Sequence, residues 1–425
     1  MIGISADDIT GSNDIGIMFT NGGYTADIYP YDAPLDFKYG KPDVLILNTN
    51  SRLDSAKTAY EKVRHATRRL KAAGCSLFFN KTCSVFRGNI GAEFDAMLDE
   101  LGEEFAVVVL GFPKNGRTTC NGVHSVWGVP LAESEFKHDP IHPMHESNLV
   151  NILAGQTKRK VGLIGHTVVD GGPEALSRAL EESRALYNYV ILDVTGQDSL
   201  WIIAQAVQDR YVLCGSSALG EELPKVLGPT PAGRGHLPLA KQEGLGILCT
   251  VGSLMPQSRE QTACAIEHGL AAYELDTVDL LETEDREAVC APLIQWISGR
   301  LLQGDDVVLY SSSAPEKIAR TREIGARQGL TSTQVGKLVS EGLAYVTAEC
   351  LHRTGLSRFL VAGGETSDAV CSALGIRGMR VWHEIEPGLP SCYSLAEDPR
   401  LFVLKSGSFG KPDFFLRAIR HLREN

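Results

Sequence analysis

Short apolar runs alternate along the chain with longer stretches in which apolar residues recur every three or four positions. Short runs that end in turn residues predict buried strands, and the stretches between them predict amphipathic helices. Strands that alternate with helices are typical of a largely parallel sheet. In the first half of the chain we expect strands at Met1–Ser5, Val44–Asn48, Ala106–Leu110, Val161–Ile164, Tyr189–Val194 and Tyr211–Cys214, and helices at Ala56–Ala73 and Ala92–Leu101.

The segment from Gly228 to Gly246 interrupts this pattern, because it is rich in proline and glycine and has no clear periodicity. We therefore predict one domain over residues 1–230 and a second over 245–425, as a chain of 425 residues suggests. Strands resume at Ile247–Val251, Asp306–Ser311, Phe359–Ala362 and Leu401–Leu404, with helices at Glu316–Gln328 and Ser332–Cys350. The predicted fold class is α/β, with two α/β domains, largely parallel sheets and a ligand cleft between them.

Composition narrows the range of partners. Acidic residues outnumber basic ones by 52 to 41, and a net charge of -11 repels nucleic acid and anionic membranes. No apolar run approaches the roughly 20 residues of a membrane-spanning helix, and the 10 cysteines contain no CxxC pair. The first residues lack the basic start of a signal peptide. We therefore expect a cytoplasmic protein with reduced thiols and neither a nucleic-acid nor a membrane partner.

Two acids, Asp7 and Asp8, follow the first predicted strand directly and precede an apolar helical stretch. Ligands of open parallel sheets bind outside the carboxyl ends of the strands, so polar chemistry is expected at this position. The alternative is that Asp7, Asp8 and Ser12 only cap the following helix, which acids do well at a positive helix end.

Three cations follow at other predicted strand ends or in polar turns. Ser51 and Arg52 come after the second strand, and Lys81 and Arg87 flank a polar turn that continues into Asn89. The planar guanidinium of arginine matches a carboxylate in two parallel hydrogen bonds. These residues predict an anion pocket, and the alternative is a solvated basic loop paired with local acids.

The second half of the chain has glycines and small hydroxyl residues after its strands, but neither a P-loop nor a dinucleotide-binding motif occurs. Glycines allow close backbone approach, and successive amide groups can surround phosphate oxygens. Three such loops in one domain favour a nucleotide phosphate site over simple turns; they lie at residues 252–253, 363–367 and 406–410.

Three histidines form an HxxxHxxH string, His138, His142 and His145, whose spacing resembles that of zinc ligands on a helix. Pro140 and Pro143 interrupt the string and should prevent a regular helix. We therefore do not predict a metal site there.

Six ordered blocks make the chain similar to the four-carbon acid sugar kinase family, which was formerly a domain of unknown function and includes D-threonate, D-erythronate and 3-oxo-tetronate kinases. The resemblance covers nearly the whole chain. The blocks are ADDITGSNDIG at 6–16, NTNSR at 48–52, KTCSVFRGNIGAE at 81–93, GRTTCNGVHSVWGVPLAESEF at 116–136, GGETSDAV at 363–370 and KSGSFG at 405–410.

The resemblance implies an N-terminal domain that binds the sugar acid and a C-terminal domain that binds ATP. It implies sugar-acid contacts for Asp8, Arg52, Lys81 and Arg87, and nucleotide contacts for Ser253, Gly363, Gly364, Glu365, Thr366 and Gly407. We also predict substrate contacts for Asp7, Ser51 and Asn89. The chain departs from the family pattern at 83–85, where Cys-Ser-Val replaces Asp-Ser-Thr, and at Asp368 and Ser408.

We expect an ATP-dependent kinase that phosphorylates a hydroxyl group of a D-threonate or D-erythronate type acid, giving the 4-phosphate. A 3-oxo-tetronate kinase and a non-catalytic sensor of sugar acid and nucleotide are the alternatives; a dehydrogenase is disfavoured because the dinucleotide motif is missing. Asp8 is the expected proton acceptor, with Asp7 as the alternative. Mg²⁺ should accompany ATP, with protein ligands that the sequence does not identify, and exposed strand edges suggest a homodimer.

Overall fold

A computed structural model describes residues 1–425 except 140–141, 209–210, 230–238 and 284. The chain groups into two compact units, Met1–Gly235 and His236–Asn425. We call these units the N-terminal and the C-terminal domain. The expected boundary segment, Gly228 to Gly246, includes residues 230–238, which lie outside the described residues.

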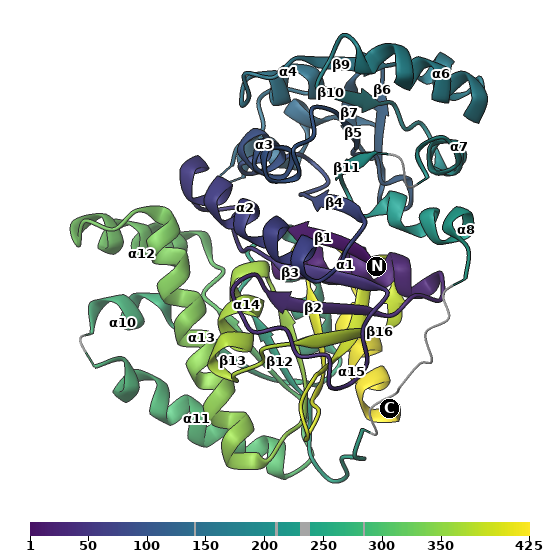
Figure 1. Cartoon of the computed structure of the whole chain (residues 1–425). Coiled ribbons are helices and arrows are strands. Elements are labelled where there is room, and N and C mark those ends of the chain that lie inside the picture. Colours follow the sequence, from purple (N-terminus) through teal and green to yellow (C-terminus); the bar gives the residue numbers. More distant parts are fainter. Residues whose placement is uncertain (140–141, 209–210, 230–238, 284) are drawn as a thin grey trace. The chain divides into compact units, whose positions relative to one another are not determined.

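A parallel sheet forms the centre of the N-terminal domain, with the strand order β2-β3-β1-β4-β11-β5-β10-β9 (Figure 1). All the pairings in this sheet are parallel. The strands are β1 (Ile2–Ala6), β2 (Ala26–Pro30), β3 (Val44–Asn48), β4 (Leu77–Lys81), β5 (Ala106–Val109), β9 (Val161–Ile164), β10 (Tyr189–Leu192) and β11 (Val212–Gly215).

Helices cover both faces of this sheet. Right-handed crossovers that run in opposite directions across a sheet place their helices on opposite faces, so α1 and α7 lie opposite α2 and α3. α2 packs against α3, as expected for two helices on the same face of the sheet. The helices are α1 (Ile9–Asn21), α2 (Ala56–Ala72), α3 (Ile90–Leu101), α4 (Leu149–Ala154), α5 (His166–Val169), α6 (Pro173–Arg184), α7 (Gln197–Val207) and α8 (Leu223–Leu227).

The N-terminal domain also contains a small antiparallel sheet, separate from the large one. Its strands are β6 (Arg117–Cys120), β7 (Val123–Val126) and β8 (Val129–Pro130). His124 of β7 is fully buried; its Nε2 lies 2.9 Å from the carbonyl oxygen of Ser84, and its Nδ1 lies 3.0 Å from the hydroxyl of Thr119. This histidine therefore ties the loop after β4 to the small sheet.

The C-terminal domain has a mixed sheet with the order β13-β14-β12-β15-β18-β17-β16. The pairings are parallel from β13 to β18, and those between β18, β17 and β16 are antiparallel. The strands are β12 (Leu248–Val251), β13 (Ala271–Leu275), β14 (Val307–Ser311), β15 (Arg358–Ala362), β16 (Met379–Glu386), β17 (Leu389–Ser394) and β18 (Leu401–Lys405).

The helices of this domain include a long one, α13, which packs against α11 and α14 (Figure 1). A capping box begins α13: the Thr331 hydroxyl accepts from the Gln334 backbone N–H, and the Gln334 side chain accepts from the Thr331 N–H. The helices are α9 (Pro256–Glu267), α10 (Thr277–Glu282), α11 (Arg286–Leu302), α12 (Pro315–Arg327), α13 (Ser332–Thr354), α14 (Gly364–Ala373) and α15 (Phe414–Glu424). The prediction of two α/β domains with largely parallel sheets is confirmed.

Candidate active site

Neighbouring strands of the N-terminal domain bring polar side chains to one edge of its sheet. β1 lies between β3 and β4, and Ala6 at its end pairs with Asn48 of β3 and Lys81 of β4. Asp7 and Asp8 follow directly. Since α1 and α2 leave this point toward opposite faces, it is a topological switch point of the kind at which open α/β sheets bind ligands.

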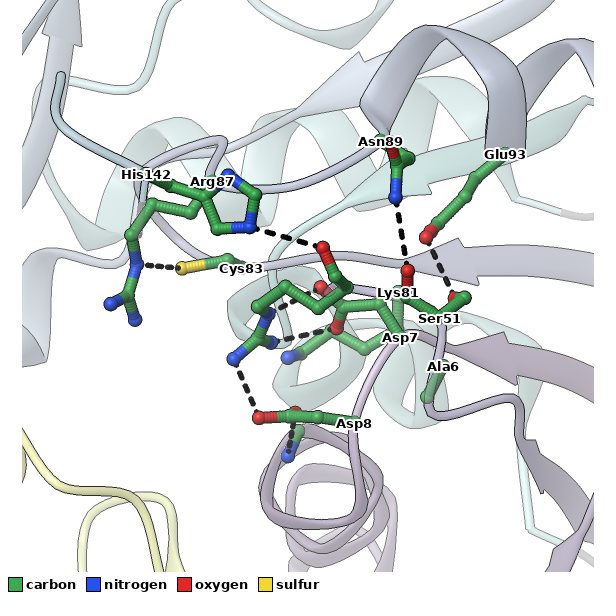
Figure 2. Close-up of polar contacts among 12 residues, drawn as sticks. Ala6, Asp7, Asp8, Ser51, Lys81, Cys83, Arg87, Asn89, Glu93 and His142 are labelled. Carbon is green, nitrogen blue, oxygen red and sulfur yellow. Dashed lines mark hydrogen bonds and ion pairs between the residues drawn. The ribbon is translucent and has the colours of Figure 1, made fainter. Parts of the chain in front are cut away.

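Arg52 is bound to both acids (Figure 2). Its Nε and Nη2 donate to the two carboxylate oxygens of Asp7, each at 2.8 Å, and its Nη1 donates to Oδ2 of Asp8 at 2.6 Å. Burial acts to raise the pKa of Asp8, but Arg52 and Lys81 outweigh it and leave the pKa lowered. The guanidinium has five N–H groups, so at most two remain for a ligand. Most of the hydrogen-bonding capacity of Arg52 is therefore used within the protein.

Asp8 also caps α1, as the alternative interpretation expected. Its Oδ1 accepts from the backbone N–H of Gly11 at 2.7 Å, and its Oδ2 accepts from the Thr10 hydroxyl at 3.0 Å. Capping and ion pairing use the same carboxylate, so the two interpretations are compatible.

Lys81 brings a buried ammonium group to this edge. Its side chain is 4% exposed, and the nearest ion-pair partner is Oδ2 of Asp14 at 3.8 Å. Among the described residues, no oxygen forms a hydrogen bond with the Lys81 ammonium. The stem of this side chain is buried while its Nζ keeps a small contact with solvent, so the donors of the ammonium are available to a ligand anion.

Asp14 has a similarly incomplete set of contacts. Its Oδ2 accepts from the Ser217 hydroxyl at 2.6 Å, but its buried Oδ1 has no hydrogen-bond partner among the described residues. Burial raises the pKa of Asp14 to about 6, although Lys81 opposes the rise. The Lys81–Asp14 pair therefore carries polar atoms that the described residues leave unsatisfied.

Arg87 stands beside Cys83 in the loop after β4. Its Nη1 donates to Asp139 at 2.6 Å, its Nε donates to the Cys83 sulfur at 3.4 Å, and its guanidinium lies 5.2 Å from the ring centre of Phe136. Burial acts to raise the pKa of the Cys83 thiol, but Arg87 and Arg52 outweigh it and leave the pKa lowered. Cys83, one of the positions at which the chain is expected to depart from the family pattern, thus lies within the electrostatic influence of two guanidinium groups.

Two predicted substrate residues have hydrogen-bond partners within the protein. Ser51 is fully buried, and its hydroxyl donates to Oε1 of Glu93 at 2.7 Å. The Asn89 amide donates to the backbone carbonyl of Ser51 at 3.0 Å (Figure 2) and to that of Asp54 at 2.9 Å. Burial, aided by Asp7, raises the pKa of Glu93 well above its usual value. These residues fix the loop that carries Arg52.

His142 supports the same loop, and sequence reasoning did not give it this role. Its Nε2 lies 3.1 Å from the backbone carbonyl of Arg52, which can only accept, so this nitrogen carries the proton. His142 belongs to the HxxxHxxH string, so the sequence does draw attention to it. That spacing suggests a metal ligand, however, and not a contact with the Arg52 loop. Asp14 and Glu93 were also missed, although both lie inside the blocks that carry the resemblance.

In the C-terminal domain, three loops follow strands that lie side by side. Val251 of β12 pairs with Ala362 of β15, which pairs with Lys405 of β18. The backbone N–H of Gly252 donates to Ala362, and that of Gly363 donates to Lys405. The sheet order again changes direction at β12, which lies between β14 and β15. The glycine loops therefore occupy a second switch point.

Ser253 lies where these loops approach one another. A Cβ on Gly407 would lie 2.3 Å from the Ser253 hydroxyl oxygen, and one on Gly363 would lie 3.2 Å from the Ser253 backbone nitrogen. A Cβ on Gly252 would meet the Thr366 hydroxyl at 2.0 Å. All the predicted nucleotide residues thus belong to adjoining loops or to the start of α14, where Gly364 and Glu365 lie.

A metal site is not evident. Within the described ranges, no group of three or more histidine, cysteine, aspartate or glutamate side chains is arranged to hold a metal ion. The described helices also include none with the length and apolar character needed to cross a membrane.

Family models match the chain over two stretches. Residues 2–223 match a sugar-binding N-terminal domain, and residues 248–415 match a nucleotide-binding C-terminal domain. The chain belongs to the four-carbon acid sugar kinase family. The resemblance inferred from the six sequence blocks is thereby confirmed.

Named relatives in this family are similar over their whole length. A 3-oxo-tetronate kinase of Cupriavidus necator is 32% identical over 435 residues, which is 99% of this chain and 97% of the relative. A 3-oxo-tetronate kinase of Haemophilus influenzae is 31% identical, covering 98% of each chain. The predicted enzyme class, a phosphotransferase with an alcohol group as acceptor, is confirmed.

Solved structures support the same fold for the family. A crystal structure from Salmonella typhimurium LT2 matches with a TM-score of 0.81 at 30% identity, covering 99% of both chains. One from Haemophilus influenzae matches with a TM-score of 0.72 at 30% identity, covering 99% of this chain and all of the other.

Proposed function

We propose that this protein uses ATP to phosphorylate a hydroxyl group of 3-oxo-tetronate or a closely similar four-carbon acid. The names of the relatives favour this acid, which we first treated as an alternative, over D-threonate and D-erythronate. The proposal rests mainly on Lys81, whose side chain is 4% exposed and whose ammonium has no hydrogen bond among the described residues. Lys81 lies at a switch point of the domain that matches the sugar-binding model.

The acid is proposed to bind with its carboxylate on Lys81. Lys81 has its donors available, whereas Arg52 has three N–H groups on Asp7 and Asp8. Two other groups would contact the hydroxyl or carbonyl oxygens of the acid. They are Arg87, which also donates a hydrogen bond to Asp139, and the remaining donors of Arg52.

Phosphoryl transfer requires little covalent chemistry from the protein. Catalysis rests on positioning and on stabilising charge, and good orientation alone can be worth about 7 to 11 kcal/mol of barrier. We propose that Asp8 orients the attacking hydroxyl and accepts its proton as the bond from its oxygen to the γ-phosphorus forms and the bond from that phosphorus to ADP, the leaving group, breaks. Since Arg52 lowers the pKa of Asp8, this carboxylate is ionised at neutral pH and ready to accept. Asp7 is the alternative acceptor.

ATP is proposed to bind the C-terminal domain through Ser253, Gly363, Gly364, Glu365, Thr366 and Gly407, in the domain that matches the nucleotide-binding model. Mg²⁺ would neutralise charge on the phosphates. No described cluster fits a dedicated Mg²⁺ site, and Mg²⁺ commonly keeps several waters beside phosphate oxygens, so we assign it no protein ligand. The cleft between the domains and the homodimer stay predictions.

A coupled ADP-release assay tests the proposal. The purified protein is given ATP, Mg²⁺ and, in turn, 3-oxo-tetronate, D-threonate and D-erythronate. We expect the highest kcat/KM with a 3-oxo-tetronate. Faster turnover of D-threonate or D-erythronate would restore our first expectation, and calorimetric binding of acid and ATP without ADP release would support the sensor instead.

A further inference from the structure

Lys405, the last residue of β18, places an ammonium group beneath one of the glycine loops. Lys405 is fully buried, and its Nζ donates to the Ser258 hydroxyl at 3.0 Å and to the backbone carbonyls of Ser406 and Gly407 at 2.8 and 3.0 Å. A lysine ammonium has three N–H donors, so all are engaged. Burial lowers the pKa of Lys405 to about 7, although Glu386 opposes this shift. Keeping the charged ammonium group in the protein interior therefore costs free energy.

The two carbonyl contacts fix the direction of the neighbouring N–H groups. A trans peptide unit is planar, and its C=O and N–H point in opposite directions. Because the carbonyls of Ser406 and Gly407 point toward Lys405, the N–H groups of Gly407 and Ser408 point away from it. Neither N–H has a hydrogen-bond partner among the described residues.

Ser258 strengthens this arrangement. Its hydroxyl accepts from Lys405 and donates to the Gly407 carbonyl at 2.9 Å. The Gly407 carbonyl is thus held by two donors, while the loop closes with a bond from the Phe409 N–H to the Ser406 carbonyl at 3.4 Å. The loop conformation therefore depends on one buried ammonium and one buried hydroxyl.

The backbone of Lys405 reaches the second glycine loop as well. Its carbonyl accepts from the N–H of Gly363 at 2.9 Å, and Gly363 directly precedes α14. The first N–H groups of a helix have no partner within the helix, and among the described residues no side chain caps those of α14. Lys405 thus connects both sets of unpaired N–H groups, and Ser253 lies close to both loops.

We propose that Lys405 is a positioning residue of the nucleotide phosphate site, holding the 406–408 loop so that its two unpaired N–H groups and the start of α14 bind the same phosphate groups. The ammonium itself does not touch the phosphates, since its donors are all engaged within the fold. This inference rests on the proposed function and deepens it.

The test compares Lys405→Met with Lys337→Met, a matched loss of a lysine that is 74% exposed on α13. ADP affinity is measured by calorimetry, and KM is measured separately for ATP and for the acid. We expect Lys405→Met to weaken ADP binding and raise the KM for ATP at least tenfold, with the KM for the acid within twofold of the wild type. Lys337→Met should change neither.

A milder variant, Ser258→Ala, decides the question if Lys405→Met does not fold. It removes one contact of the ammonium and one donor to the Gly407 carbonyl, so ADP affinity should fall at least twofold while the KM for the acid holds. Thermal unfolding without nucleotide checks that each variant is folded.

The outcomes separate the inference from the proposed function. If the wild type does not bind ADP, both are overturned. If the wild type binds ADP and a folded Lys405→Met binds it within twofold, only the role of Lys405 is overturned. A parallel rise in the KM for ATP and for the acid would also overturn it, because that pattern reports a general structural defect. When Ser258→Ala is the deciding variant, unchanged ADP affinity has the same consequence.

Discussion

Replacing Lys81 by methionine tests the proposed carboxylate contact most directly. Methionine keeps much of the apolar length of lysine but removes the ammonium. The Lys81 side chain is 4% exposed and has no hydrogen bond in the described part of the protein, so the change breaks no bond that the fold depends on. The ion pair to Asp14 is long, at 3.8 Å, and Asp14 can take up a proton because burial has already raised its pKa to about 6.

The expected magnitude follows from the single charged contact that the acid would lose. A hydrogen bond to a charged group is worth about 1.5 to 3 kcal/mol. At roughly 1.4 kcal/mol per factor of ten, this loss corresponds to an increase of about 10- to 150-fold in the KM for the acid. The KM for ATP should stay within twofold of the wild type, because ATP is proposed to bind the other domain.

The assay is steady-state ADP release with the acid and ATP varied independently, together with thermal unfolding. Lys57→Met is the control: Lys57 lies on α2 in the same domain, its side chain is 86% exposed, and it forms a long ion pair with Glu61 at 4.0 Å, away from the loop that carries Arg52. It should leave both KM values unchanged. A folded Lys81→Met whose KM for the acid stays within twofold of the wild type would refute the proposed contact.

Three other changes probe the same domain. Asp8→Asn should lower kcat about 100-fold or more, as loss of a general base does, and a kcat within twofold of the wild type would remove Asp8 from this role. Arg52→Lys should lower the free energy of unfolding by about 1 to 3 kcal/mol in urea titrations, because lysine cannot form the two parallel bonds to Asp7; unchanged stability would contradict this. Burial holds the pKa of His124 at about 3, below that of an unfolded histidine, so stability should fall as pH drops below about 6.5, by up to roughly 1.4 kcal/mol per pH unit. His124→Gln should flatten this slope between pH 6 and 4, and an unchanged slope would exclude His124 as its source.

Many element positions could be predicted from the sequence because buried parallel strands are short, continuous apolar runs. The strand expected at Val44–Asn48 is identical to β3, and the helix expected at Ala56–Ala73 ends one residue later than α2. β13 was missed because it is mostly half-exposed and has no continuous apolar signal. β4 was missed because its apolar residues give way to Asn80 and Lys81.

Much of the placement of polar groups could be predicted from the amino-acid sequence. Asp7 and Asp8 follow a predicted strand of one domain, and Gly363 and Gly407 follow predicted strands of the other, so the positions of these groups could be derived from alternating elements and parallel-sheet geometry. Local pattern suffices for this, since a strand's end is visible in its own residues.

Which of these groups are engaged, and which have donors available, depends on the folded structure. Arg52 is committed to Asp7 and Asp8, Ser51 is buried against Glu93, and Lys81 has no hydrogen bond among the described residues. Hydrogen-bond pairing depends on atoms brought together from distant parts of the chain, to within a fraction of an ångström. A sequence pattern specifies the residue types at a site but not these distances.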